Sequence, residues 1–578
     1  MRENRKRTGA AAAASVLLAF IFGLAVYQTM GFVYAIADDV IMRDIASGAF
    51  TGTPDGHLIF VQYALGWLIS RLYLINRSVD WYGFFMAGAL FLSLAAILYR
   101  GLAAEKSLRW KCVYSVGAMG VTLTALVAHA AQFEWTISAA ALGAAALYLY
   151  VSAGRGKTTV ADGVWIWLLL ILTYGIRSDV FFMVLPGFGL AFLWKTFRKN
   201  VNVKKWEFNR RELALPILVF AGIGLLFLTE KLAYRGADWA EFQRFQNARS
   251  EVYDYAGVPT YEGDPEFFEE RNISSEEVRA LRHYALYLVD GMDAGLMESL
   301  SAEAQRQAGA EPGMMAKVKA AVKLAAEQFL SPEYFTASLS AVIFLALAAL
   351  LLWKREKRLL LPVLIYLCAH GLLWLALGYV GRLPERVAFS LHLVMLGACG
   401  GLFTCFCEKE EDRCAWLRPA VGLLCLLSLG AVLFQWQGAK AGNQEKLAMD
   451  GSFQTFKNAC KEDTDHLYFI ETYMAEPVGG ARVTANGNFS LNRCLTLGDW
   501  YTDSPLDQER FAALGIDSVE QTLLTEQNAY LVVRDVEEPG FFASWLAWKR
   551  PEAELTEKES REIDGRMYYF YQIQERNR

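Results

Sequence analysis

Long apolar segments of roughly 17–22 residues recur along this chain, the length that a helix needs to cross about 30 Å of hydrocarbon. The chain is 54% hydrophobic and only 20% charged, which disfavours a soluble fold of this size. We predict a polytopic α-helical membrane protein of about eleven transmembrane helices. The predicted spans are residues 10–30, 81–99, 112–130, 133–151, 162–176, 178–194, 212–230, 336–353, 359–378, 387–407 and 419–436.

The basic residues predict the orientation of these spans, because Lys and Arg near span ends gather on the cytoplasmic side. All of the clusters fall on that side only if the apolar segment 57–75 does not cross the membrane. We therefore predict that 57–75 is an interfacial helix, that the N-terminus is cytoplasmic and that the C-terminus is extracytoplasmic. The clusters lie at residues 2–7, 100–111, 155–157, 195–211, 354–358 and 409–418.

This orientation divides the chain into a membrane region, residues 1–436, and an extracytoplasmic tail, residues 437–578. Short apolar runs alternate with helical stretches in the tail, which predicts a small α/β domain. Asp564-Gly565 lies between two alternating runs and predicts a β-hairpin. The remaining extracytoplasmic pieces are a first outer loop at 31–80, a long outer loop at 231–335 and a short turn at 379–386.

Several common functions lack their sequence signatures. The net charge of −5 argues against a nucleic-acid partner. The chain contains no Walker loop, no Gly-rich dinucleotide fingerprint and no GxSxG motif, and its histidines have no metal-ligand spacing. Cys460 and Cys494 are the only cysteines in the tail, and the sequence leaves open whether they pair.

Asp38 and Asp39 follow the first span directly. Two adjacent carboxylates at a membrane boundary raise one another's pKa, and polar groups at that depth are candidates for function. Asp39 could pair with Arg43 at i,i+4, whereas Asp38 has no such local partner. Asp38 is therefore the better candidate for a general base and Asp39 for a supporting role. Simple solvation of a helix end is the alternative for both residues.

Arg382 and Arg386 flank Pro384 in the turn GYVGRLPERVAFS, on the predicted outer surface. Guanidinium groups bind phosphate through two parallel hydrogen bonds, and proline restricts the movement of the turn. We predict that this turn binds a phosphate or pyrophosphate headgroup. The alternative is that both side chains extend to anionic lipid.

Other charged residues near predicted outer helix ends are candidates for substrate binding. Arg177 could instead pair with Asp179, and Glu134 could be a solvated helix end. Arg235 and Arg249 alternate with aromatic residues, a pattern that also fits an ordinary juxtamembrane helix. The complete set of such candidates is Arg43, Glu134, Arg177, Arg235 and Arg249.

This layout resembles the GT-C superfamily of integral-membrane glycosyltransferases. The motif that carries the resemblance is Asp38-Asp39 in YAIADDVIMRDIASGAF, since the family places an acidic pair in its first outer loop. The turn GRLPERV looks like the arginine-bearing outer loops of some members. The resemblance covers the topology of residues 1–440, and the tail matches no domain of the family.

The resemblance implies a bacterial cell-membrane enzyme that moves a sugar from a polyprenyl-phosphate-linked donor to a cell-envelope glycan, glycolipid or surface protein. Asp38 or Asp39 would deprotonate the acceptor hydroxyl, and Arg382 and Arg386 would stabilise the departing phosphate. No cofactor is required, although Mg²⁺ or Mn²⁺ bound by the two aspartates is compatible with the family.

Two other functions remain open. One is a transporter or flippase for a lipid-linked glycan, which would show matched inverted halves that we do not find in the sequence. The other is a non-catalytic envelope-assembly protein, which would tolerate the loss of both aspartates.

Overall fold

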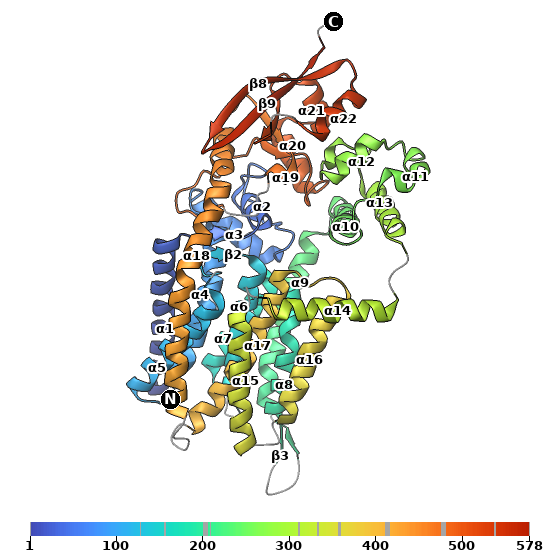
Figure 1. The fold of residues 1–578 in the computed structure, drawn as a ribbon. Coiled ribbons are helices and arrows are strands. Elements are labelled where there is room, and N and C mark those ends of the chain that lie inside the picture. Colours follow the sequence, from blue (N-terminus) through green and yellow to red (C-terminus); the bar gives the residue numbers. More distant parts are fainter. Residues whose placement is uncertain are drawn as a thin grey trace.

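The computed structural model describes residues 2–127, 129–154, 158–199, 206–208, 210–309, 313–331, 335–355, 360–410, 417–475, 481–536 and 539–576. This part of the chain is mostly helical, and eight of its helices are long and apolar enough to cross a membrane. They form a bundle that carries a mixed sheet at one end (Figure 1). The eight helices are α1 (Arg2–Met30), α4 (Trp81–Leu102), α6 (Trp135–Ser152), α8 (Ser178–Thr196), α9 (Ala214–Ala233), α16 (Leu360–Tyr379), α17 (Glu385–Glu410) and α18 (Leu417–Glu462).

The other three predicted spans also form helices, but these do not meet the same criteria of length and apolarity. They are α5 (Leu108–Leu126), α7 (Val160–Ile176) and α15 (Phe335–Arg355). The first turn of α5 carries Arg109 and Lys111, and α7 has only 17 residues, whereas α15 is apolar over Phe335–Ala349, the part whose side chains the structure describes. Parts of the basic clusters, including residues 155–157, 356–358 and 411–416, lie outside the described residues.

The first outer loop folds against the start of α6. β1 (Val33–Tyr34) pairs in parallel with β2 (Gln132–Phe133), and α2 (Ala37–Ser47) follows β1 directly. This pairing places the acidic pair in the first turn of α2 close to Glu134, the N-cap residue of α6. The predicted interfacial helix is α3 (Tyr63–Ile75), which begins six residues later than predicted.

The long outer loop is helical, as its polar, helix-favouring sequence predicts. Figure 1 shows α10, α12 and α13 near the helices of the tail, and α14 running across the bundle. Its elements are α10 (Ala237–Ser250), a π-helical turn (Glu251–Ala256), short 3-10 turns (Tyr261–Gly263 and Leu286–Leu288), α11 (Pro265–Glu269), α12 (Ser275–Arg282), α13 (Ala294–Gln307) and α14 (Met314–Phe329).

The tail has the predicted α/β character. Its five strands have the order β6-β5-β7-β9-β8, and β8 and β9 form the predicted hairpin, with Asp564 and Gly565 both at positive φ. The predicted boundary at residue 437 falls inside α18, which continues from the bundle up to the sheet (Figure 1). The tail elements are β5 (Leu467–Ile470), α19 (Thr472–Ala475), β6 (Cys494–Thr496), α20 (Pro505–Leu514), α21 (Val519–Thr525), β7 (Ala529–Arg534), α22 (Phe541–Lys549), β8 (Ala553–Ile563) and β9 (Arg566–Glu575), and a small hairpin elsewhere consists of β3 (Phe197–Lys199) and β4 (Trp206–Phe208).

The tail segment 481–492, which precedes β6, is hydrogen-bonded into the first outer loop. The Val483 amide donates to the Phe32 carbonyl at 2.8 Å, and the Asn492 amide donates to the Ala49 carbonyl at 2.8 Å. In return the Tyr34 amide donates to the Ala481 carbonyl at 3.0 Å. These backbone bonds on both sides of α2 make the tail part of the structure that holds the acidic pair.

A buried ion network joins α2 to α18. The Arg43 guanidinium donates to Asp44 at 2.7 Å, and Lys457 lies 3.1 Å from the other carboxylate oxygen of Asp44. The predicted pairing of Arg43 with Asp39 is therefore wrong. Arg43 packs between the rings of Tyr34 and Phe489, where Asp44 is the carboxylate within reach.

Asp44→Asn is expected to destabilise the protein by about 3–5 kcal/mol, because it removes the charge of the one carboxylate that contacts both buried cations, Arg43 and Lys457. Burial raises the pKa of Asp44, but the charges of Arg43, Lys457 and Lys461 outweigh it and hold the pKa well below the usual range. The carboxylate therefore stabilises the fold at neutral pH and loses this effect only as pH falls through the depressed pKa. Thermal unfolding followed by tryptophan fluorescence measures the change.

Glu559→Gln is the matched control for this prediction. It breaks an ion pair with Arg561 in which both side chains are 46% exposed, and such pairs contribute about 1 kcal/mol or less. An Asp44→Asn protein as stable as the Glu559→Gln protein would contradict the role assigned to the network.

Candidate functional site

Asp38 lies in the first turn of α2, partly exposed, where positive charges from three other segments act on it. Burial raises the pKa of this carboxyl above its usual value. Arg386, Arg249 and Arg177 oppose the rise, in that order of strength, while Asp254 adds to it. Asp38 is thus a carboxylate with a raised pKa that nearby cations still favour in its ionised form.

Asp39 is fully buried and has a different environment. Burial and the neighbouring Glu134 raise the pKa of Asp39 well above its usual value. The Tyr82 hydroxyl donates to one carboxylate oxygen at 2.6 Å, and the second oxygen is buried with no hydrogen-bond partner among the described residues. Adjacent carboxyls whose environments separate their pKa values are typical of sites that divide acid and base roles. Here Asp38 is the base candidate, and burial opposes the ionisation of its neighbour Asp39.

Glu134 is also buried, so its interpretation as a solvated helix end is wrong. One of its carboxylate oxygens accepts from the Ile137 amide at 2.9 Å and caps α6. Burial raises the pKa of Glu134, and Arg386 opposes the rise. The acid therefore combines a structural role with a place in the charged cluster.

Trp135 connects two of the arginines. The guanidinium carbon of Arg177 lies 5.4 Å from the centre of the Trp135 ring, and that of Arg386 lies 5.8 Å from it. Arg177 also forms the predicted ion pair with Asp179, at 3.2 Å. Arg386, by contrast, forms no ion pair within the described part of the chain, and the indole N–H of Trp135 is buried without a partner there.

Arg249 and Arg382 meet at Asp254. One carboxylate oxygen of Asp254 lies 3.7 Å from Arg249 and 3.9 Å from Arg382. Asp254 and Arg249 belong to the long outer loop, and Arg382 belongs to the turn before α17. The Arg249 guanidinium also donates to the Tyr284 hydroxyl at 2.6 Å. Arg382 is half exposed and packs over the Tyr255 ring at 4.8 Å. The two arginines thus border the cluster on the side of the long loop.

The structure therefore gathers most of the predicted site residues from five separate segments. Arg43 is not among them, since it belongs to the network with Asp44, and Arg235 is an exposed residue whose charge does not act on Asp38. The sequence predictions missed Tyr82 and Trp135. The one available signal was that Trp135 directly follows Glu134. The gathered residues are Asp38, Asp39, Glu134, Arg177, Arg249, Arg382 and Arg386.

A preformed metal site of three protein ligands is not found across the described ranges. Mg²⁺ often takes only one or two carboxylates and completes its shell with substrate phosphate and water. Of the two aspartates, Asp39 is the more costly ligand, because burial opposes its ionisation.

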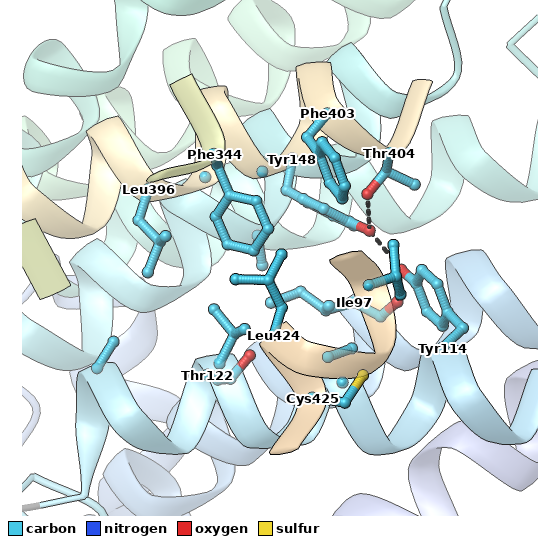
Figure 2. A pocket seen from close by; sticks show the side chains of 18 of the residues that line it. Ile97, Tyr114, Thr122, Tyr148, Phe344, Leu396, Phe403, Thr404, Leu424 and Cys425 are labelled. Atoms are coloured by element: carbon cyan, nitrogen blue, oxygen red, sulfur yellow. Dashed lines mark hydrogen bonds between the residues drawn. The ribbon is translucent and has the colours of Figure 1, made fainter. Parts of the chain in front are cut away.

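A cavity of about 580 Å³ lies within the bundle, lined mainly by apolar side chains of α4, α5, α6, α15, α17 and α18. Figure 2 shows Phe344, Leu396 and Leu424 around it, with the Tyr148 hydroxyl hydrogen-bonded to Tyr114 and, at 3.0 Å, to Thr404. The lining residues of α17 begin at Leu393, seven residues after Arg386, which is two helical turns or about 10 Å along the helix. The cavity therefore lies along the same face of α17 as Arg386, on its C-terminal side.

No family model, curated protein or solved structure matches this chain. The fold itself defines a class: a multi-helix, apolar protein of the membrane type with a C-terminal α/β part.

Proposed function

We propose that this protein is a glycosyltransferase of the GT-C type, which moves a sugar from a polyprenyl-phosphate-linked donor to a cell-envelope acceptor outside the membrane. The observation that carries the proposal is the meeting of one base candidate, Asp38, with a cation, Arg386, that acts on it electrostatically and forms no direct ion pair within the described chain. A transfer reaction requires both groups at one site, whereas a scaffold requires neither.

The proposed reaction is a direct displacement. Asp38 takes the proton of an acceptor hydroxyl as its oxygen bonds to the anomeric carbon of the sugar, and the bond from that carbon to the phosphate oxygen breaks. Arg386, together with Arg177 and Arg382, stabilises the negative charge that develops on the departing phosphate. Asp39, whose ionisation burial opposes, has the supporting role beside Asp38.

The apolar cavity supports a donor with a lipid tail. Its α17 lining, Leu393, Leu396, Gly397, Gly400 and Thr404, continues the helical spacing that starts at Arg386. A phosphate bound at Arg386 would therefore have an apolar, membrane-embedded path below it. The proposal includes the orientation predicted from the basic clusters, with the site and the tail on the extracytoplasmic side.

Reconstitution into liposomes separates this proposal from lipid transport. The protein is supplied with a labelled polyprenyl-phosphate sugar in the membrane and an acceptor glycan outside. A transferase moves the label from the lipid to the acceptor. A flippase would leave the label on the lipid but expose it to an enzyme confined to the other side of the membrane, and that outcome would overturn the proposal.

The pH dependence of transfer provides a further prediction. Because burial raises the pKa of Asp38, kcat/KM should fall on the acidic side at a pH above the value of about 3.9 that is usual for aspartate. Arg249→Gln removes a charge that lowers the pKa of Asp38, so the acidic limb of the kcat/KM profile should move to higher pH. Asp254→Asn removes a charge that raises it and should move the limb to lower pH.

The two shifts have opposite signs, which general damage to the site would not produce. Shifts of the same sign, or a limb unchanged in both variants, would contradict the assignment of Asp38 as the base.

A further inference from the structure

Two cysteines of the tail meet where α18 reaches the sheet. Cys460 lies two residues before the end of α18, and Cys494 is the first residue of β6. Both side chains are buried in one small core with Phe456 and Tyr468. Because α18 packs against β6 here, the two thiols are neighbours in this core.

These two residues differ from the other cysteines of the chain. The five other cysteines that the structure describes lie in the apolar helices α5, α16, α17 and α18, where a thiol is usually a small hydrophobic side chain: Cys112, Cys368, Cys399, Cys405 and Cys425. A metal does not explain the pair, because no third ligand joins it within the described residues. The nearby His466 and Asp463 instead bond to each other at 2.9 Å.

We propose that Cys460 and Cys494 form a disulfide in the mature protein. The inference rests on the outward orientation of the tail that the proposed function includes, because disulfides persist on that side of the membrane. The two thiols lose two protons and two electrons as the sulfur–sulfur bond forms. A disulfide of an extracytoplasmic thiol oxidoreductase accepts both and becomes two thiols. The two thiols share one buried core, which is where a disulfide between α18 and β6 would form.

The bond would fasten the part of the tail that holds the first outer loop. It closes residues 461–493 into a loop between its two ends, and this loop contains β5 and the segment 481–492. That segment makes the backbone hydrogen bonds to Phe32 and Ala49 on either side of α2. A cross-link to α18 therefore limits how far the segment can move from the acidic pair, and it restricts the unfolded chain as well.

Thiol counting tests the inference on the full-length protein. Cells with an intact extracytoplasmic disulfide-forming system are lysed in N-ethylmaleimide, and the membrane protein is denatured, digested and analysed by mass spectrometry. We expect seven modified cysteines without reductant, nine after reduction, and a peptide pair joined through Cys460 and Cys494 that is two hydrogens lighter than its reduced parts. Nine modified cysteines without reductant would overturn the inference.

Variants give an independent readout. The reductant should lower the thermal midpoint of the wild type by several degrees and leave that of the Cys460→Ser/Cys494→Ser double variant unchanged. Equal sensitivity of the two proteins to reductant would also overturn the inference.

A labelling control separates failure of the disulfide from failure of the orientation. Glu562→Cys, an exposed position on β8, is added to the double variant and treated in intact cells with a membrane-impermeant maleimide. If Glu562→Cys is labelled in this variant and the thiol count finds Cys460 and Cys494 free in the wild type, only the disulfide is refuted. If it is not labelled, the outward orientation and the proposed function fail with it.

Discussion

Asp38→Asn is expected to lower the rate of sugar transfer by about 100- to 10,000-fold, the range typical of losing a general base. Asparagine has nearly the same shape as aspartate and cannot accept the acceptor proton. Asp38 is partly exposed and forms no ion pair within 4 Å among the described residues. The variant should therefore fold as the wild type does. The loss should appear in kcat measured with saturating donor, and donor binding should change little.

Two variants control this result. Asp238→Asn removes an exposed carboxylate from the first turn of α10, away from the site, and should leave the rate unchanged. Asp39→Asn replaces a carboxyl whose ionisation burial opposes and which has only the supporting role, so its effect on kcat should be much smaller than that of Asp38→Asn. An Asp39 variant that is the more damaged of the two would reverse the roles assigned to this pair.

Arg386→Ala is expected to lower kcat/KM by about 100- to 1,000-fold, as for the loss of one donor to a developing oxyanion. Arg386 is the strongest cation acting on Asp38, and its guanidinium carbon lies 5.8 Å from the centre of the Trp135 ring. Its removal also raises the pKa of Asp38, so the comparison belongs at a pH well above the acidic limb of the profile.

Arg386→Lys should recover part of the loss, because an ammonium keeps the charge but lacks the paired N–H groups that fit phosphate. Arg235→Ala is the matched control, since Arg235 is exposed and lies outside the cluster. Wild-type activity in Arg386→Ala would rule out the proposed phosphate site.

The sequence predicts the helices well because each one depends mainly on local composition. The apolar segments all form helices, and the Asp564-Gly565 turn forms its hairpin, since both signals are contained in a few consecutive residues. The start of α3 at Tyr63 was missed because residues 57–62 are as apolar as the helix, and tertiary contacts, such as that of the His57 ring with Trp239, fix their conformation instead.

The site could be predicted only in part, for the same reason. Asp38 and Arg386 stood out because charge at a membrane boundary is costly and therefore informative. The contact of Arg386 with Trp135, and the burial of Glu134, depend on the pairing of β1 with β2 and on the packing of α6 against α17. The preference of Arg43 for Asp44 over Asp39 likewise required Lys457 of α18, which lies more than 400 residues away in the sequence.

The most direct test of the central claim uses the purified wild-type protein, a panel of radiolabelled polyprenyl-phosphate sugars and crude envelope acceptors. We predict that at least one donor will pass its label from the lipid fraction to the acceptor, and that Asp38→Asn will abolish this transfer while Asp238→Asn will not. If all label stays on the lipid with every donor, although the protein is folded and both variants complement a deletion in cells, the catalytic account is contradicted.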